Sequence, residues 1–323
     1  MQFNKKGTIL VTSLWIMTIL AIFTTGIGFR VSIEARLNKN NMDRLKGIYL
    51  AKAGIIKSQE LLARDNNSYD SVRECGIMVS PINTSGETDQ LARIFTEGLG
   101  DGKFTVSYEE EGKTLYGMMD EERKININKA SAEVLKNLLG SDNEEAAESI
   151  VNWRSSNIRL PKGASDDYYR SLTPPYECKH ADFSVIEELM LVKGVTPQLF
   201  ESIKDCVTVY GDDGKININT ATRRVMLSAG LDQGTVDIIM TIRNGPDRIA
   251  GTKDDGMLSG DIASQLSVPM DSPTRTVLGN YFTTVSNYFR IEAKGLASGS
   301  KIYSKVACIV KRGEKRLLYY REY

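Results

Sequence analysis

The residues of this sequence that are best suited to nucleophilic or metal chemistry lie in the middle of the chain. His180 is the sole histidine, and Cys178 precedes it by two positions. A thiol and an imidazole at this spacing indicate either a pair of metal ligands or a Cys–His nucleophile. The sequence favours a simpler interpretation, a loop histidine beside a structural cysteine. Because a phosphate-binding loop of the Walker type is also missing from the sequence, we expect a protein that is not an enzyme.

Acidic side chains indicate a second kind of site, in the segment 244–256. Turn-forming residues surround three carboxylates there, those of Asp247, Asp254 and Asp255. Oxygen ligands at flexible spacing suit Ca²⁺, although the segment lacks the bidentate glutamate of an EF-hand loop. Asp166 and Asp167 are a weaker candidate for the same ion. A solvated acidic loop is the alternative at both places, and Ca²⁺ is the one cofactor that the sequence suggests.

The cysteines add little to the choice of cofactor. Cys75, Cys178, Cys206 and Cys308 lie far apart and form no C-x-x-C motif, so neither a zinc ribbon nor a thioredoxin-like site is supported. An exported domain could pair them in three ways, and the sequence does not choose among these pairings. Four buried free thiols is the alternative.

The amino-terminal segment has the strongest pattern in the chain. A short polar leader ends at Gly7, and the 22 residues from Thr8 to Phe29 then carry no charge. As a helix they span roughly 33 Å, enough for a hydrocarbon core of about 30 Å. A buried core helix rarely runs this long without a charge, and a secretory signal is shorter and ends in an A-x-A-like site, which does not follow Phe29. The segment therefore predicts one retained membrane-spanning helix.

Length and composition limit the number of domains and the class of protein. The chain has 323 residues, which predicts one to three domains, and 41% of them are hydrophobic, which is ample for a folded core. Lys plus Arg and Asp plus Glu both number 41, so the formal net charge is zero. A typical nucleic-acid-binding protein has a basic excess instead.

The elements that must position these residues follow from periodicity. Apolar residues at helical spacing continue the first helix to about Arg64, and we expect one face of it to pack on a domain; they are Ile33, Leu37, Leu45, Ile48, Ile55, Leu61 and Leu62. A short helix is predicted within 91–99, and two alternating runs, 103–108 and 113–119, predict a hairpin. Strand-rich runs return at 281–294, 301–311 and 314–320. The middle, 128–280, reads as helical, so the fold class is α+β with an antiparallel sheet split by a helical insertion; two independent domains are the alternative.

The middle contains a degenerate repeat. The sequence KININKAS at 124–131 recurs as KININTAT at 215–222, and each copy leads into two apolar helical stretches, of which the second ends at Arg154 or Arg243. Several polar side chains are candidate helix N-caps, namely Asn128, Asn219, Ser131, Thr220 and Thr222. These pieces and the turn 192–195 resemble helix-hairpin-helix modules, which implies DNA binding as a rival function. Acidic residues near the glycine turns repel phosphate, so we interpret the hairpins as packing modules.

The amino-terminal segment resembles type IV prepilins and type II secretion pseudopilins. The resemblance implies cleavage between Gly7 and Thr8 by a prepilin peptidase, with methylation as a further expectation. Family members usually carry Glu as the fifth residue after the cut, where it is thought to neutralise the amine of a neighbouring subunit. Here that residue is Thr12, and the first Glu is Glu34. The K-type minor pseudopilin resembles this chain in lacking the Glu and in having Leu14-Trp15.

Motifs of the middle region extend the resemblance to the K type. They stand in that family's order, and they are Trp153-Arg154, 163–169, 174–176, Glu188-Leu189 and 214–221. The implied boundaries are a leader at 1–7, a membrane helix at 8–30, a pilin-like part at 31–127, a helical insertion at 128–280 and final strands at 281–323. Calcium binding is a feature of some K-type members, which strengthens the Ca²⁺ expectation.

The resemblance also implies a function and a location. It implies a structural tip subunit of a type II secretion pseudopilus, a single-pass protein of the bacterial inner membrane with its globular part in the periplasm. The implied partners are minor pseudopilins of the I, J and H types, the prepilin peptidase and the inner-membrane secretion platform, with no nucleic acid. The alternatives are a minor pilin of a type IV pilus or DNA-uptake system, and a membrane-anchored DNA-binding protein.

Overall fold

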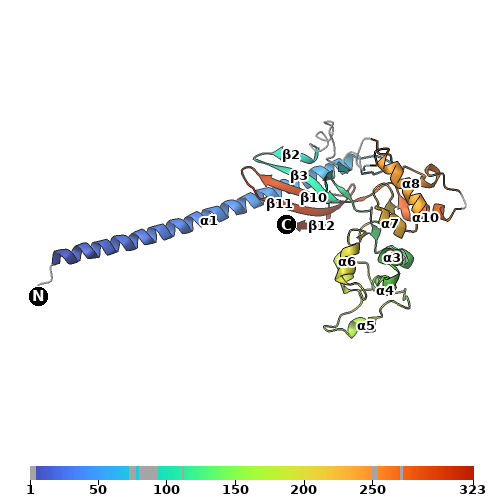
Figure 1. Ribbon diagram of the computed structural model, residues 1–323, viewed down its shortest axis with the longest axis horizontal. Helices are drawn as coiled ribbons and strands as arrows, with labels where there is room; N and C mark the ends of the chain where they lie inside the picture. The colour runs from blue at the N-terminus through green and yellow to red at the C-terminus, as the bar shows by residue number, and fades with distance from the viewer. Residues whose placement is uncertain (1–4, 73–77, 80–93, 111–112, 249–253, 270–271) are drawn as a thin grey trace.

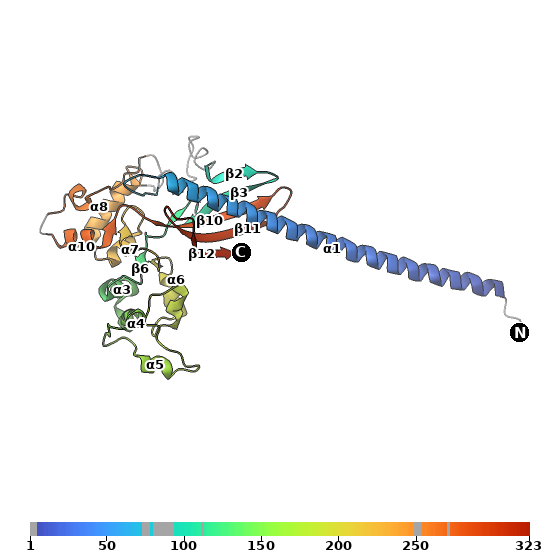
Figure 2. The same ribbon diagram turned by 180° about the vertical axis from the view of Figure 1, so that it is seen from behind.

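The computed structural model combines a long helix, an antiparallel sheet and a helical unit beyond one end of the sheet (Figure 1). It describes residues 5–72, 78–79, 94–110, 113–248, 254–269 and 272–323. The first helix, α1 (Lys5–Arg64), is 60 residues long and unbroken. Its amino-terminal half projects away from the rest of the molecule, and its last turns, from about Gly47, lie across the sheet (Figures 1 and 2).

The packing face of α1 begins later than its periodicity predicts. Ile33 and Leu37 are exposed, and so are the apolar side chains between Ile9 and Phe29. Burial starts near Gly47 and includes Ile48, Ala51, Ile55 and Leu62. The spacing therefore located the right stripe, but only its last turns have a sheet beneath them.

Two glycines allow α1 to approach the sheet backbone closely. A Cβ on Gly295 would lie 1.9 Å from the carbonyl oxygen of Gly47, a separation that no side chain tolerates. Ser304 donates a hydrogen bond of 2.9 Å to the carbonyl of Arg44 beside this contact. Helix and sheet thus meet backbone to backbone.

The sheet has eight strands and is antiparallel throughout. Its strands are β1 (Met78–Val79), β2 (Thr96–Leu99), β3 (Gly102–Glu110), β4 (Lys113–Gly117), β5 (Met119–Asp120), β10 (Tyr288–Ala297), β11 (Tyr303–Lys311) and β12 (Leu317–Glu322). Their order is β1-β4-β3-β10-β11-β12, with β2 beside β3 and β5 beside β10. The predicted hairpin is β3–β4, and β3 pairs directly with β10, so the sheet is indeed interrupted by an insertion. Of the segment 91–99, where a short helix was predicted, residues 94–95 are helical and 91–93 lie outside the described residues. Residues 96–99 form strand β2 instead, because they pair with the neighbouring β3.

The inserted helical unit has its own apolar core. Its helices are α3 (Ala132–Leu139), η1 (Ser141–Asn143), α4 (Glu144–Arg154), α5 (Asp166–Arg170), η2 (Ile186–Leu191), α6 (Pro197–Ile203), α7 (Arg223–Ser228), α8 (Gln233–Asn244), α9 (Ile262–Gln265) and α10 (Pro273–Tyr281). Two short parallel pairs brace it: β6 (Ile125–Asn126) with β7 (Val207–Thr208), and β8 (Ile216–Asn217) with β9 (Phe282–Thr283). The insertion lies between β5 and β10.

Candidate metal-binding loops and assembly surface

The repeated sequence produces the same local structure twice. Ser131 accepts a hydrogen bond from the amide of Val134 and caps α3, and Thr222 accepts one from Val225 and caps α7. Two of the predicted caps are therefore confirmed. Thr220 has another role, since its hydroxyl lies 2.6 Å from a carboxylate oxygen of Asp120 in the sheet.

The predicted caps Asn128 and Asn219 are clamps instead. Asn128 accepts from the backbone amide of Phe183 at 2.7 Å and donates to the carbonyl of the same residue at 3.0 Å. Asn219 does the same with Leu258, at 2.9 and 2.8 Å. A primary amide has both a donor and an acceptor, so it can pair with both backbone groups of one distant residue. The sequence pattern could not reveal this, because the partners lie far along the chain.

The arginines that end each helix pair are also equivalent. Arg154 donates to the carbonyls of Ile127 and Ala130. Arg243 donates to the carbonyls of Ile218 and Ala221, at 3.2 and 2.6 Å. In each copy the arginine binds the turn before the first helix of the pair. The asparagine, Asn128 or Asn219, binds the residue at which the chain comes back to this turn, Phe183 or Leu258. We define the segment between the arginine and this residue as loop A (155–182) in the first copy and loop B (244–257) in the second.

Loop A gathers three metal-ligand side chains. Donor atoms of Asp166, Cys178 and His180 all lie within 4.8 Å of one another. His180 Nε2 is 2.9 Å from a carboxylate oxygen of Asp166. The side chain of Asp167 is 93% exposed and faces Arg170, so the two adjacent aspartates do not point to one site. The sequence held the signal, a Cys-x-His motif following an aspartate, but did not reveal that these residues meet.

Cys178 is poorly suited to be a nucleophile. It is buried, and its sulfur lies 3.7 and 3.6 Å from the carbonyl oxygens of Asn152 and Trp153. Burial raises the pKa of the thiol, which keeps it protonated at neutral pH. Cys206 and Cys308 are also buried free thiols, whereas Cys75 lies outside the described residues.

In loop B the main chain of Asp247 lies beside the side chain of Asp254, another of the predicted acidic ligands. The backbone amide of Asp247 donates to Asp254 Oδ2 at 3.0 Å. Asp255 lies elsewhere, lining a small cavity with Asn244. The Oδ1 atom of Asn244 is buried and accepts no hydrogen bond from the described residues. This is an oxygen-rich loop with one unsatisfied acceptor, and residues 249–253 within it lie outside the described part.

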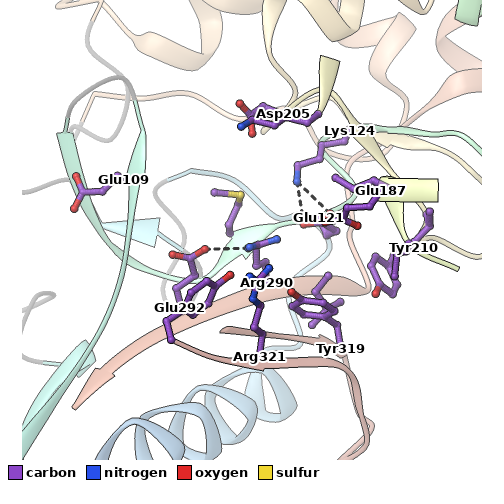
Figure 3. A pocket seen from close by; sticks show the side chains of 17 residues that line it. Glu109, Glu121, Lys124, Glu187, Asp205, Tyr210, Arg290, Glu292, Tyr319 and Arg321 are labelled. Carbon is purple, nitrogen blue, oxygen red and sulfur yellow. Dashed lines mark hydrogen bonds and ion pairs between the residues drawn. The ribbon is translucent and has the colours of Figure 1, made fainter. Parts of the chain in front are cut away.

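A cleft of about 360 Å³ separates the sheet from the helical unit (Figure 3). Its charged side chains pair with one another: Lys124 with Glu121 at 3.1 Å, and Arg290 with Glu292 at 3.0 Å. Asp205 and Glu187 approach from the helical side, and Tyr319 and Arg321 from β12. Such a balanced surface suits contact with polar groups, and none of its labelled side chains is an activated nucleophile.

Buried carboxyl groups join the sheet to the insertion. Asp120 is fully buried and accepts hydrogen bonds from Asn217, at 2.9 Å, and from Ser286, at 2.7 Å. Glu122 accepts from the amide of Tyr288 at 3.3 Å and from that of Asn287. Burial raises the pKa of Glu122 to about 7, and the nearby Asp120 carboxyl adds to this effect. The joint is thus polar and sensitive to protonation.

The largest exposed apolar surface is the projecting half of α1. Among the described residues it is the one helix long and apolar enough to cross a membrane, with a mean hydropathy of 2.0 in its most apolar window. The helix begins at Lys5, so the backbone of Gly7 and Thr8 is helical. Cleavage between these two residues remains a prediction.

Fold and surface together define a class: a pilin-like assembly subunit with an amino-terminal apolar helix and a sheet that carries an extra helical unit. Residues 114–212 match the family model of the type II secretion system protein K. The type II secretion system protein K of Pseudomonas aeruginosa is 23% identical over 254 residues, which cover 75% of this chain and 74% of that protein.

A solved structure has the same fold. It is the GspK-GspI-GspJ complex from the type 2 secretion system of enterotoxigenic Escherichia coli, matched with a TM-score of 0.63 and 16% identity over 90% of this chain and 99% of the matched chain. The three matches support the prediction from the sequence motifs that this chain is a type II secretion system minor pseudopilin of the K type.

Proposed function

We propose that this chain is the tip subunit of a type II secretion pseudopilus. The observation that carries the proposal is Thr12, which stands where other pseudopilins have a glutamate. Its hydroxyl bonds to the carbonyl of Ile9 within α1, at 2.9 Å, and offers no charge to the amine of a neighbouring subunit. The helical unit supports the same position, because it adds bulk beside the end of the sheet that faces away from the projecting helix (Figure 1).

The proposal includes a location and partners. The projecting half of α1 would cross the inner membrane once, with the sheet and helical unit in the periplasm. Minor pseudopilins of the I, J and H types would pack along α1, and the matched solved structure is a complex of GspK with GspI and GspJ. The prepilin peptidase would cut after Gly7, and the secretion platform would then insert the subunit. The proposed role is structural, through binding and without turnover.

Amino-terminal sequencing of the mature protein tests the proposal. We expect the mature chain to begin at Thr8, and a Gly7→Val variant to keep its leader and fail to support secretion. A mature chain that begins at Met1 or beyond Phe29 would contradict the proposal. A second arm purifies the chain alone, where long homopolymers would equally contradict a tip position.

We also propose that loop B binds Ca²⁺. The unsatisfied Oδ1 of Asn244 lines a small cavity together with Asp255, and this supports a hard cation in the loop. The proposed ligands are the carboxylates of Asp247, Asp254 and Asp255. Thermal melting with Ca²⁺ and with a chelator tests it, and no shift between the two would count against it.

DNA binding is a weaker candidate. Lys193, beside the turn glycine Gly194, is paired with Glu145 at 2.7 Å and lies over the ring of Tyr168. Its charge is therefore neutralised by an acidic neighbour. DNA retention that falls steeply with salt would favour this candidate over the structural role.

A further inference from the structure

We propose that Asp166, Cys178 and His180 of loop A bind a divalent transition metal ion of the zinc class. The site differs from the calcium loop in position and in chemistry, and it does not depend on the proposed assembly role. Its donors are a thiol sulfur, an imidazole nitrogen and a carboxylate oxygen, which is a set that zinc accepts and calcium does not.

The distances suit a shared ion. Zinc bonds of about 2.1 to 2.3 Å require tetrahedral ligand atoms about 3.4 to 3.7 Å apart. The three donor atoms already lie within 4.8 Å of one another, and the shortest separation is the 2.9 Å between His180 Nε2 and Asp166 Oδ1. An ion between them would therefore require the His180–Asp166 pair to open by about 0.5 Å.

The histidine lies between two oxygen atoms in an orientation that suits a metal ligand. Nδ1 faces the carbonyl oxygen of Ser155 at 3.3 Å, while Nε2 faces the Asp166 carboxylate. A neutral imidazole has one N–H, so it can donate to one of these oxygens only. With Nδ1 as the donor, the lone pair of Nε2 is on the side of Asp166 and is available to a metal ion. A carbonyl on the far nitrogen is also the usual partner of a metal-bound histidine.

The surroundings hold the ligands in place and leave one position open. The backbone amide of His180 donates to the carbonyl of Trp153 at 2.8 Å, and Arg159 holds the other oxygen of Asp166 at 3.2 Å. A cavity of about 210 Å³, lined by Asp166 and His180, adjoins the site. Water from this cavity would complete four-coordination. An ion held there would join the start of α5 to the return segment of loop A.

Metal titration of the detergent-solubilised full chain, stripped with a chelator, tests the proposal. We expect one equivalent of Zn²⁺ to bind in competition with a chromophoric chelator, and excess Ca²⁺ not to displace it. Co²⁺ should give the absorption of a tetrahedral site together with a thiolate-to-metal charge-transfer band. A Co²⁺ complex without that band, or no Zn²⁺ binding at all, would overturn the proposal.

Variants identify the ligands. Cys178→Ser and His180→Gln should each weaken Zn²⁺ binding at least 100-fold, and Asp166→Asn at least tenfold. Matched controls are Asp167→Asn, a neighbouring exposed carboxylate, and Cys206→Ser, another buried thiol; neither should change the affinity. Should Cys178→Ser not fold, His180→Gln at a partly exposed position and the Co²⁺ spectrum of the unaltered chain still decide. Equal affinity in His180→Gln and the unaltered chain would refute the site.

Discussion

The two copies of the repeat in the helical unit share a frame and differ in their loops. In both, a hydroxyl caps the first helix, an arginine binds two carbonyls of the preceding turn, and an asparagine clamps a distant backbone residue. Loop A then carries sulfur, nitrogen and oxygen donors, whereas loop B carries oxygen donors alone. The frame fixes where a loop starts and ends, and so leaves its interior free to acquire different chemistry.

The copies also differ in what lies beyond them. Asn126 of the first copy donates to the carbonyls of Tyr210 and Gly211, both at 3.0 Å, within the helical unit. The equivalent Asn217 of the second copy donates to Asp120 and Ser286 at the sheet. One copy therefore faces inward and the other attaches the insertion, although their sequences are nearly the same.

Removal of the closing arginine should have the largest effect. Arg243→Ala would leave the carbonyls of Ile218 and Ala221 buried without this donor, so we expect a loss of about 3 kcal/mol in the free energy of unfolding, measured with urea. Arg154→Ala should destabilise less, since Arg154 is less deeply buried than Arg243. Equal losses would contradict the expected dependence on burial and would remove this difference between the two copies.

Stability should fall as pH rises through the range in which Glu122 titrates. The unfolded carboxyl has a pKa near 4.5, and the folded one a pKa of about 7. The folded state therefore binds the proton more tightly, and its advantage is complete below pH 4.5 and lost by pH 7, at up to about 3 kcal/mol. Urea unfolding of Glu122→Gln at several pH values checks this. The variant should lose less stability than the unaltered chain as the pH rises from 4.5 to 7, and an unchanged pH profile would contradict the assignment.

Substitution of the clamping asparagines, Asn128 and Asn219, should affect metal binding by one loop at a time. Asn128→Ala removes the partner of Phe183, so we expect roughly tenfold weaker Zn²⁺ binding by loop A and unaltered Ca²⁺ binding. Asn219→Ala should have the reverse effect on loop B. Calorimetric titration of both variants with both ions measures the four affinities. Parallel losses in all four would mean that the loops are not independent.

The smallest expected effect is at loop B alone. We expect Ca²⁺ to raise the melting temperature of the unaltered chain by a few degrees. Asp254→Asn should abolish this increase without changing the melting temperature measured with a chelator. Asp142→Asn, an exposed acidic residue on η1, is a matched control. Differential scanning fluorimetry suffices, and a calcium shift that persists in Asp254→Asn would locate the ion elsewhere.

Much of the fold could be predicted from the sequence because local patterns determine it. The alternation in 103–119 predicts the β3–β4 hairpin, and strand-rich runs on both sides of a helical middle predict the interrupted sheet. The short helix predicted within 91–99 is present at 94–95, but 96–99 are a strand because they pair with β3, which local propensity does not reveal. Ile33 and Leu37 have the spacing of a packing face, yet nothing in a sequence says how far along α1 the sheet extends.

The sites were predictable only in part, since long-range contacts create them. Asp166, Cys178 and His180 are each visible in the sequence, but their convergence depends on the return of loop A past Trp153. Asp167 was predicted as a Ca²⁺ ligand together with Asp166, but its side chain is exposed to solvent. The buried joint at Asp120 and Glu122 had no signal at all, because its partners lie about a hundred residues or more away along the chain.

The contact between Gly47 and Gly295 has a mechanical consequence. Because backbone packs directly on backbone there, no side chains separate α1 from the sheet, and the helix cannot easily rotate against it. The 60 residues of α1 form a straight helix of roughly 90 Å. A tilt imposed at the amino-terminal end of α1 would turn the sheet through the same angle. The molecule can therefore transmit force and orientation along α1, because no flexible hinge separates the helix from the sheet.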